Sequence, residues 1–597
     1  MIRTVRLVLP LAVLACSDAA PPPQQQAPAK VPRIAVEAGV VRLGRGTDRV
    51  VQAGVSKPVL PLSADAVIDL GAAGLGQRII DVGVTLQGPP TLDRQTSAAC
   101  RTWIEAPGVG EANAQTLEAR LDRWSEASLR IEAPLPAVAR LRLDCAAPSG
   151  TLLRWAQPLA RPLASAEPAP LIVLISLDTL RADHVTGFGG PEGLTPQLEA
   201  LGAEGLRFQS TVAEGTWTLP SHYAMLRSAL YGYDIERGRP SSLAEVFAGA
   251  GYHTLAATGG GFVGVFFYFD QGFDHFDERW QGTDDLTAQV DAVRRRLEAS
   301  RGVPTFLFFH TYAVHEPSAV EQAWYDEHGK WRKFWPTRQH AEEIRDFYAS
   351  LVARMDRDLA PLFATLRAHA EERPVLVVLT SDHGEAFLEH GGFRHGYNRT
   401  RQTLHDELTR VPMIVWGPGL IPADREIHWP VMLSNIAPSM LEATGIERPP
   451  SMMGRSLWAV WTGSTEVNRT TGALSQTQGS WAFRAGNHKL IVKMPPKGER
   501  ALLLYDVEND PEEREDLLAR DGERADAMLE QLRTRLLDFG VSSPSGTLPE
   551  CPDCEINAAS AFLHGVMQDD PQNIELFRQR VREETEARLK ALGYAED

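Results

Sequence analysis

Polar side chains that can bind a metal ion follow two apolar runs of this chain. The run LIVLISL leads to Asp178, and the run VLVVLTS leads to Asp382 and His383. Because the carboxyl ends of parallel strands meet at one edge of a sheet, these side chains can reach one point from rigid backbone. Two carboxylates and an imidazole are ligands that divalent cations take in proteins. A third run, TFLFF, leads to His310 and His315.

A hydroxyl group stands where it can react beside such a metal. In GTWTLPSH, Thr218 comes just before Pro220, and proline favours the first position of a helix. A helix N-terminus presents free N–H groups and a positive dipole end, which suits a tetrahedral oxyanion. The metal would stabilise the alkoxide of Thr218 as a nucleophile, and the histidines would hold or protonate the substrate. The predicted metal ligands are Asp178, Thr218, Asp382 and His383.

The elements that carry these residues follow from the hydrophobic pattern. The apolar runs are typical of strands buried on both faces of a parallel sheet. They alternate with helical patterns, such as TPQLEALGAEG and the stretch from about residue 341 to residue 369. Strands that alternate with helices predict a doubly wound α/β sheet with its ligands at the carboxyl ends of the strands.

Changes of pattern divide the chain into segments. Short strands separated by turns predict a jelly-roll-like β-sandwich, and short strands before an amphipathic helix at about 522–539 predict a smaller C-terminal α+β subdomain. The sandwich could bind a glycan, or it could serve as a structural spacer or lid. We favour the structural role. The predicted segments are a signal peptide (1–16), a flexible tether (17–33), the N-terminal β-sandwich (34–162), the catalytic α/β domain (171–465), the C-terminal subdomain (466–545) and a helical tail (546–597).

The N-terminus is typical of an export signal. Arg3 and Arg6 precede a short apolar stretch that ends in VLAC, which resembles a bacterial lipobox with Cys16 as the lipidated residue. An ordinary secretory signal with a chance cysteine is the alternative. The Pro-, Gln- and Ala-rich stretch that follows cannot form a core. We expect a protein of the bacterial cell envelope, anchored through Cys16 to the outer membrane or on the periplasmic face.

Cysteine use agrees with export, and the net charge argues against one class of partner. Cys100 and Cys145 fall in one strand-rich region and are candidates for a disulfide, and Cys551 and Cys554 form a CxxC that favours a local disulfide over zinc. The net charge of −17 argues against nucleic acid as a partner. The hydrophobic content of 43% is that of a globular protein.

From Leu171 to about Tyr505 the chain resembles the sulfatase family of the alkaline phosphatase superfamily. Four motifs match in order: LDTLRADHVTGFGG, TPQLEALGAEGLRF with TWTLPSHYAML, FFHTYAVHEPS, and SDHGEAFLEHGGFRHG. The resemblance implies a sulfatase-like α/β fold and hydrolysis of a phosphate or sulfate ester, with Thr218 at the nucleophile position. Carried over by position, it gives the metal-ligand role to Asp178, Asp382 and His383.

The same resemblance assigns four further catalytic positions. His315 corresponds to a histidine that contacts the substrate, and His395 stands where relatives place a basic residue near the leaving group. Arg181 follows the first metal-binding aspartate at a spacing that is common in relatives cleaving phosphate esters. His222 occupies the position that is usually arginine in the family signature.

Departures from the family pattern bear on the chemistry. Sulfatases carry Cys or Ser at the nucleophile and oxidise it to formylglycine, whereas the methyl group of Thr218 leaves no route to that aldehyde. Thr179 stands in place of a second acidic residue, and TGGGFVG replaces the usual Lys-x-His after Gly251. A threonine alkoxide beside a metal is suited to phosphoryl chemistry, so we favour phosphate mono- or diesters over sulfate esters.

Several alternatives stay open at this point. One alternative to a hydrolase is a catalytically weak protein that binds an envelope glycan. Another is a transferase that moves a phospho-headgroup to an acceptor in the envelope. The expected substrate is an anionic ester, such as one on an envelope glycan or a phospholipid headgroup. Two carboxylates and a hydroxyl favour Ca²⁺ as the one divalent metal, whereas the imidazole of His383 favours Mn²⁺ or Zn²⁺.

Overall fold

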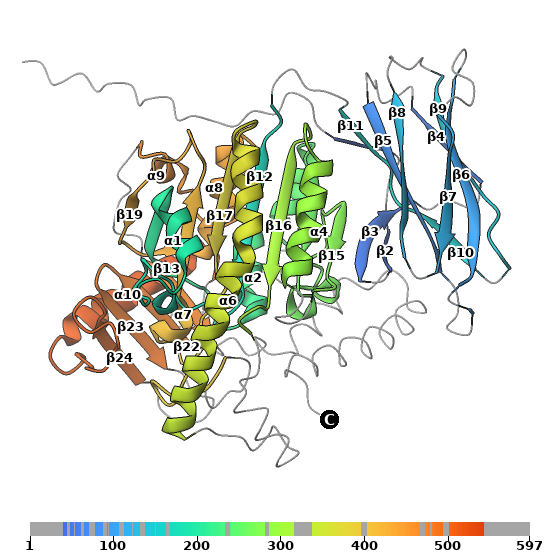
Figure 1. The fold of residues 1–597 in the computed structure, drawn as a ribbon. Helices are drawn as coiled ribbons and strands as arrows, with labels where there is room; N and C mark the ends of the chain where they lie inside the picture. The colour runs from blue at the N-terminus through green and yellow to red at the C-terminus, as the bar shows by residue number, and fades with distance from the viewer. Residues whose placement is uncertain are drawn as a thin grey trace, which may run out of the picture.

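The computed structural model describes residues 40–541 with gaps (Figure 1). The predicted signal peptide, Cys16, the tether, Cys551, Cys554 and the helical tail lie outside the described residues. Within the described part of the chain, no helix is both long and apolar enough to cross a membrane. The gaps are residues 44–47, 53, 61–64, 71–77, 88–91, 94, 107–112, 122, 132–137, 150, 163–167, 233–238, 281–285, 316–336, 396–402, 465–471, 478–479 and 494–500.

A mixed sheet of 11 strands forms the centre of the molecule. Its middle strands are parallel and almost wholly buried, because helices cover both of their faces. The parallel strands, in spatial order, are β17 (Val375–Thr380), β12 (Leu171–Leu177), β16 (Thr305–Thr311), β14 (His253–Ala257) and β15 (His275–Asp277). In β12, Leu171 pairs with Val375 on one side and with Thr305 on the other, so the carboxyl ends of all three strands are level.

Antiparallel pairing extends this sheet at both ends. β18 (Arg410–Trp416) runs antiparallel to β17 and to β13 (Leu206–Val212), which also pairs with two short strands. At the other end the hairpin of β2 (Asp48–Gln52) and β3 (Val55–Val59) pairs with β15. The two short strands are β19 (Arg425–Ile427) and β20 (Val431–Met432).

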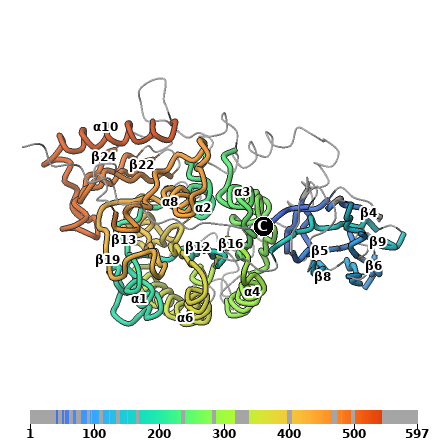
Figure 2. The backbone as a smooth tube through the Cα atoms, turned by 90° about the horizontal axis from the view of Figure 1, so that it is seen from above, coloured from blue at the N-terminus to red at the C-terminus, as the bar shows by residue number. Residues whose placement is uncertain are grey.

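Helices cover both faces of the sheet, as Figure 2 shows from above. One layer packs on Leu171, Val173 and Ile175, and the other packs on Ile172 and Leu174, because side chains alternate along β12. The first layer contains α1 (Pro196–Ala203), α4 (Leu286–Ala299) and α6 (Arg338–Ala370). The second contains α2 (Thr218–Arg227), α3 (Leu243–Gly249), α8 (Ile436–Ala443) and α9 (Trp458–Trp461). Shorter helices are η2 (Ala182–His184), η4 (Gly261–Val263), η5 (Val265–Phe267), α7 (Asp406–Thr409) and η8 (Leu433–Asn435). The predicted doubly wound α/β fold is confirmed, with a mixed rather than a purely parallel sheet.

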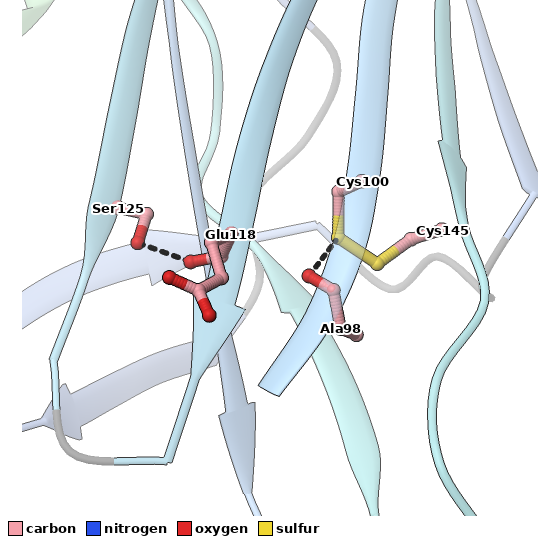
Figure 3. Close-up of a disulfide and its surroundings, with 5 residues drawn as sticks. All are labelled: Ala98, Cys100, Glu118, Ser125 and Cys145. Atoms are coloured by element: carbon pink, nitrogen blue, oxygen red, sulfur yellow. Dashed lines mark hydrogen bonds between the residues drawn. A yellow bond between two sulfur atoms is a disulfide. The ribbon is translucent and has the colours of Figure 1, made fainter. Parts of the chain in front are cut away.

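The N-terminal region is a sandwich of two antiparallel sheets around one apolar core. The disulfide expected as a candidate from the sequence is present, and it joins Cys100 of β6 (Ser97–Glu105) to Cys145 of β9 (Arg140–Cys145) (Figure 3). One sheet contains β1 (Val41–Arg42), β11 (Leu159–Pro162), β5 (Arg78–Gln87), β10 (Leu152–Trp155) and β8 (Ser125–Ile131). The other contains β4 (Asp65–Asp69), β9 (Arg140–Cys145), β6 (Ser97–Glu105) and β7 (Gln115–Arg120).

Partly buried polar contacts join the sandwich to the α/β domain. The guanidinium of Arg42 donates to both carboxylate oxygens of Asp274, at 2.8 and 2.7 Å, and to the carbonyl oxygens of Ala248 and Tyr252. Such a bidentate charged pair is among the stronger polar contacts in proteins. The β2–β3 hairpin also pairs with the central sheet, so the N-terminal region contributes strands to the central sheet as well as to the sandwich.

The C-terminal subdomain has the predicted α+β form. Its sheet is antiparallel, and α10 (Gly522–Asp538) packs on it close to the predicted helix bounds. Glu214, just after β13, ties this subdomain to the centre. Its carboxylate accepts from the Ser434 N–H at 2.8 Å, and its carbonyl oxygen accepts from the Gln476 N–H at 2.8 Å. The sheet contains β21 (Ala473–Thr477), β22 (Ser480–Ala485), β23 (His488–Lys493) and β24 (Ala501–Asp506).

The buried carboxyl group of Glu214 makes stability depend on pH. Burial raises its pKa from 4.5 to about 7, against the opposing effect of the Ser434 hydrogen bonds. The folded chain therefore holds this proton to higher pH than the unfolded chain, so the contribution of Glu214 to stability is fully present below pH 4.5 and is lost as the pH rises through 7. A shift of this size corresponds to roughly 3 kcal/mol.

We therefore expect Glu214→Gln to flatten this pH dependence. The melting temperature of the native chain should fall between pH 5 and pH 8 by more than that of the variant, as measured by circular dichroism. Parallel melting profiles of the two proteins would contradict the assignment.

Candidate metal and nucleophile site

The level strand ends bring the predicted metal ligands together. Asp178 follows β12, and Asp382 and His383 follow β17 next to it. The Nε2 atom of His383 lies 3.3 Å from Asp382 Oδ2 and 3.9 Å from Asp178 Oδ1. All three side chains are fully buried. Asp178 and Asp382, which are 204 positions apart in the chain, thus lie in one cluster because β12 and β17 are neighbours.

A strained turn supports this cluster. Thr179 has φ of 59°, a left-handed conformation that is costly for a β-branched residue. The conformation directs the Thr179 N–H to Asp382 Oδ1 at 3.2 Å, and the Tyr348 hydroxyl donates to the Thr179 carbonyl oxygen at 2.7 Å. The His383 N–H donates to the same Asp382 oxygen at 2.9 Å. One oxygen of Asp382 is therefore fixed, and the other faces the cluster.

Hydrogen bonding decides which nitrogen of His383 bears a proton. Nδ1 lies 2.8 Å from the carbonyl oxygen of Gly384, which can only accept, so Nδ1 carries the hydrogen. The lone pair on Nε2 then faces the two carboxylates. Asp178 Oδ1 and Asp382 Oδ2 are buried and have no hydrogen-bond partner among the described residues. Three electron-rich atoms that face one another fit a bound cation.

The electrostatics of the pair point the same way. Burial, and then the charge of Asp382, raise the pKa of Asp178 well above its usual range. Burial also opposes ionisation of Asp382, but positive charge on His383 and His222, when they are protonated, and the Thr179 N–H outweigh it and lower the pKa of that carboxyl. A divalent cation between the carboxylates would reverse the rise at Asp178, because a positive charge favours the ionised form.

The predicted nucleophile lies at this cluster. Thr218 is the first residue of α2, which begins two positions before Pro220 rather than at it. Its Oγ1 atom lies 3.4 Å from His383 Nε2, and its side chain is fully buried. The hydroxyl therefore lies both at a helix N-terminus and beside the atoms that fit a cation.

His222 holds the backbone of Thr218 instead of facing the cation position. Its Nδ1 lies 2.8 Å from the Thr218 carbonyl oxygen, so Nδ1 carries a hydrogen and Nε2 accepts from the Ser176 hydroxyl at 2.9 Å. The same Nδ1 lies 3.4 Å from Asp382 Oδ2. One atom each from Asp178, His222 and Asp382 lie within 4.8 Å of one another, yet the N–H of His222 leaves no lone pair there for a metal.

Two of the predicted catalytic histidines form a chain next to the cluster. The Nε2 atoms of His315 and His395 lie 3.0 Å apart, so they share one proton between them. The Nδ1 atom of His395 lies 2.9 Å from a carboxylate oxygen of Glu385, and burial raises the pKa of Glu385 to about 7. The His395 ring lies 4.3 Å, between centroids, from the His383 ring. Proton movement along Glu385, His395 and His315 is therefore possible beside Thr218.

Arg181 was predicted to be catalytic, but its guanidinium binds neighbouring loop residues. Its guanidinium binds both oxygens of Asp183 at 2.8 and 2.6 Å, Glu389 Oε1 at 2.6 Å and the Glu385 carbonyl oxygen at 2.8 Å. These bonds fasten the turn after β12 to the loop after β17. A catalytic contact of Arg181 stays a prediction, and it would require some of these bonds to break.

Two functional candidates, Glu385 and Ser176, were not assigned a role from the sequence, and the contact of His310 with Asp178 was not predicted. Glu385 is part of SDHGE, and its contact with His395 depends on how the loop folds back. Ser176 is the only polar residue in LIVLISL, and this isolated hydroxyl in a buried strand is a sequence signal that could have identified it as a candidate. His310 was named at a strand end, but only the fold shows that its Nε2 lies 3.2 Å from Asp178 Oδ2.

Comparisons with known proteins concern the α/β domain and the C-terminal subdomain. The Sulfatase family model matches residues 170–446, and the model of the N-sulphoglucosamine sulphohydrolase C-terminal region matches residues 393–541. A phosphonate monoester hydrolase of Agrobacterium radiobacter superposes with a TM-score of 0.50 at 16% identity, covering 62% of this chain and 96% of that chain. That likeness shows a shared fold.

Curated relatives match over shorter stretches. Arylsulfatase K of Xenopus laevis is 26% identical over 221 residues, which cover 35% of this chain and 40% of that protein. Arylsulfatase K of Homo sapiens is 31% identical over 121 residues, which cover 20% of this chain and 21% of that protein. The chain thus spans less than half the length of these relatives. The two family models overlap and together run from residue 170 to residue 541, so this part of the chain is similar to sulfatases.

Proposed function

We propose that this protein hydrolyses a phosphate mono- or diester through Thr218, with a divalent cation held by Asp178, Asp382 and His383. One observation carries the proposal. The Thr218 hydroxyl, at the start of α2, lies 3.4 Å from a His383 nitrogen whose lone pair faces two carboxylate oxygens without partners among the described residues. When bound, the cation would lower the pKa of the hydroxyl and offset charge on the ester oxygens.

The side chains of this site supply the remaining parts of a displacement. The Thr218 hydroxyl gives its proton to water and its oxygen forms a bond to phosphorus, while the bond from phosphorus to the leaving oxygen breaks. His315 or His395 gives a proton to the leaving oxygen, and their shared hydrogen bond lets the proton be replaced through Glu385. Water then cleaves the phosphothreonine ester and restores Thr218. The N-terminus of α2 favours the negative charge that develops.

Threonine is the reason for preferring phosphate over sulfate. The extra methyl of Thr218 prevents formation of an aldehyde, so an aldehyde hydrate is excluded as the nucleophile at this position. Sulfate esters remain the second candidate substrate, because curated relatives carry the name arylsulfatase. A site that only binds a glycan is less well supported, since a buried pair of unneutralised carboxylates is costly without a cation to hold.

The metal and the location are also proposed. Two carboxylates favour Ca²⁺, and the nitrogen ligand of His383 keeps Mn²⁺ and Zn²⁺ as alternatives. We place the protein in the bacterial cell envelope, acting on an anionic ester of a glycan or a lipid headgroup. The Cys100–Cys145 disulfide supports an oxidising compartment, and lipidation at Cys16 rests on the lipobox-like sequence.

The first test measures turnover of aryl phosphate, aryl phosphodiester and aryl sulfate by the metal-loaded chain. Thr218→Ala should lower kcat at least about 10³-fold, because the attacking oxygen is lost, and one of the phosphate esters should be cleaved faster than the sulfate. Thr216→Ala is the matched control, since it removes another buried threonine hydroxyl two residues away and should keep most of the activity.

Equal rates for the native chain and Thr218→Ala would remove Thr218 from the mechanism. Faster cleavage of the sulfate would select the second candidate. Product analysis with a glycerol acceptor separates hydrolysis from transfer, because a transferase would release phosphoglycerol.

The second test measures metal binding without turnover. At 100 times the dissociation constant, a bound cation stabilises the folded state by about 2.7 kcal/mol, so Ca²⁺, Mn²⁺ or Zn²⁺ should raise the melting temperature of chelator-treated protein. Asp382→Asn should abolish that increment. Asp291→Asn, which changes a half-exposed acid on α4, should keep it. The same increment in Asp382→Asn would contradict the assigned ligands.

A further inference from the structure

His310 makes a contact that fixes one of the proposed metal ligands. It lies near the end of β16 and is fully buried. Its Nδ1 accepts from the backbone N–H of Gly259 at 3.2 Å, and its Nε2 lies 3.2 Å from Asp178 Oδ2. Because the backbone N–H can only donate, Nδ1 carries the lone pair and the hydrogen of a neutral imidazole is on Nε2. His310 therefore donates to Asp178.

This bond divides the two oxygens of Asp178 between different tasks. Oδ2 accepts from His310, and the Asp178 backbone N–H is held by the Thr311 carbonyl oxygen at 3.1 Å. Oδ1 is left facing His383 Nε2 at 3.9 Å, without a hydrogen-bond partner among the described residues. The carboxylate is thus held with a single oxygen free for a ligand.

The glycine-rich stretch TGGGFVG, at residues 258–264, supplies the N–H that fixes His310. It approaches β16 so closely that a Cβ on Gly259 would lie 2.1 Å from Cδ2 of Tyr312. The Tyr312 hydroxyl donates to the Gly260 carbonyl oxygen at 3.1 Å, and the Tyr312 ring meets the His310 ring edge-on with centroids 4.6 Å apart. Glycine at position 259 is what allows this approach.

We propose that His310 is a positioning residue for Asp178, and that the glycine-rich stretch holds His310 in the tautomer that donates to it. This inference rests on the cation site of the proposed function. It gives a role to a stretch that departs from the family pattern. In this role the backbone N–H of Gly259 orients His310, which lies on β16. Hydrogen-bond partners of metal ligands act in this way by fixing ligand orientation.

The test measures Mn²⁺ affinity of the full chain after metal removal, by electron paramagnetic resonance of free Mn²⁺. His310→Leu keeps a buried apolar side chain of similar size but removes the donor, so the dissociation constant should rise about 10- to 100-fold. His310→Gln can place an amide N–H near the position of Nε2, so it should recover most of the lost affinity. Circular dichroism checks that each variant is folded.

The outcomes separate this inference from the proposed function. If the native chain binds no Mn²⁺, Ca²⁺ or Zn²⁺, both fail together. If the native chain and His310→Leu bind Mn²⁺ equally, the positioning role is overturned while the cation site stands. A folded His310→Gln that binds as weakly as His310→Leu overturns the role of the hydrogen bond.

A second pair of variants tests the glycine-rich stretch without changing His310. Gly259→Ala forces the stretch away from Tyr312 and should weaken Mn²⁺ binding in the same direction as His310→Leu. Gly249→Ala is the matched control, because a Cβ there meets no described atom within 4 Å. Unchanged affinity in Gly259→Ala would overturn the role of this stretch.

Discussion

Two carboxylates buried side by side are the constraint around which the catalytic domain is built. Asp178 and Asp382 are fully buried, and a lone pair of His383 faces both of them. Like charges so close together in a medium of low polarity repel strongly, and a protein retains them only with a proton or a cation between them. The hydrogen bonds to the outer oxygens, from His310 and from the backbone of Thr179 and His383, leave the inner oxygens free. The negative charge of both carboxylates is thereby directed to the position between their inner oxygens and His383.

The parallel register of the sheet makes this arrangement possible. β12 pairs with β16 and β17 without a shift, so residues that follow each strand emerge at the same level. Each neighbour then contributes a different part: β17 leads to two ligands, β16 carries His310 and leads to His315, and α2 presents Thr218 from the helix layer. The central chemistry thus depends on rigid elements, whereas the Arg181 bonds tie the two adjoining loops to each other.

Much of this arrangement can be predicted from sequence because it rests on local patterns. Apolar runs ending in Asp178 and Asp382 indicate strands and their polar ends, and Pro220 indicates a helix start near Thr218. Contacts between distant loops cannot be predicted in this way. The bonds of Arg181 to Glu389, of Glu385 to His395 and of Gly259 to His310 depend on how separate segments meet. The β2–β3 hairpin was missed for the same reason, since its strand pattern fits either sheet.

That hairpin determines which strand lies at this end of the central sheet. β15 is a strand of three residues, and without β3 it would leave unpaired N–H and C=O groups at the edge of a large sheet. The N-terminal region covers this edge with its own backbone and is then anchored by Arg42 and Arg49. In the intact chain β2 is the last strand at this end of the central sheet, whereas an α/β domain cut free after residue 162 would have the three-residue β15 as its edge.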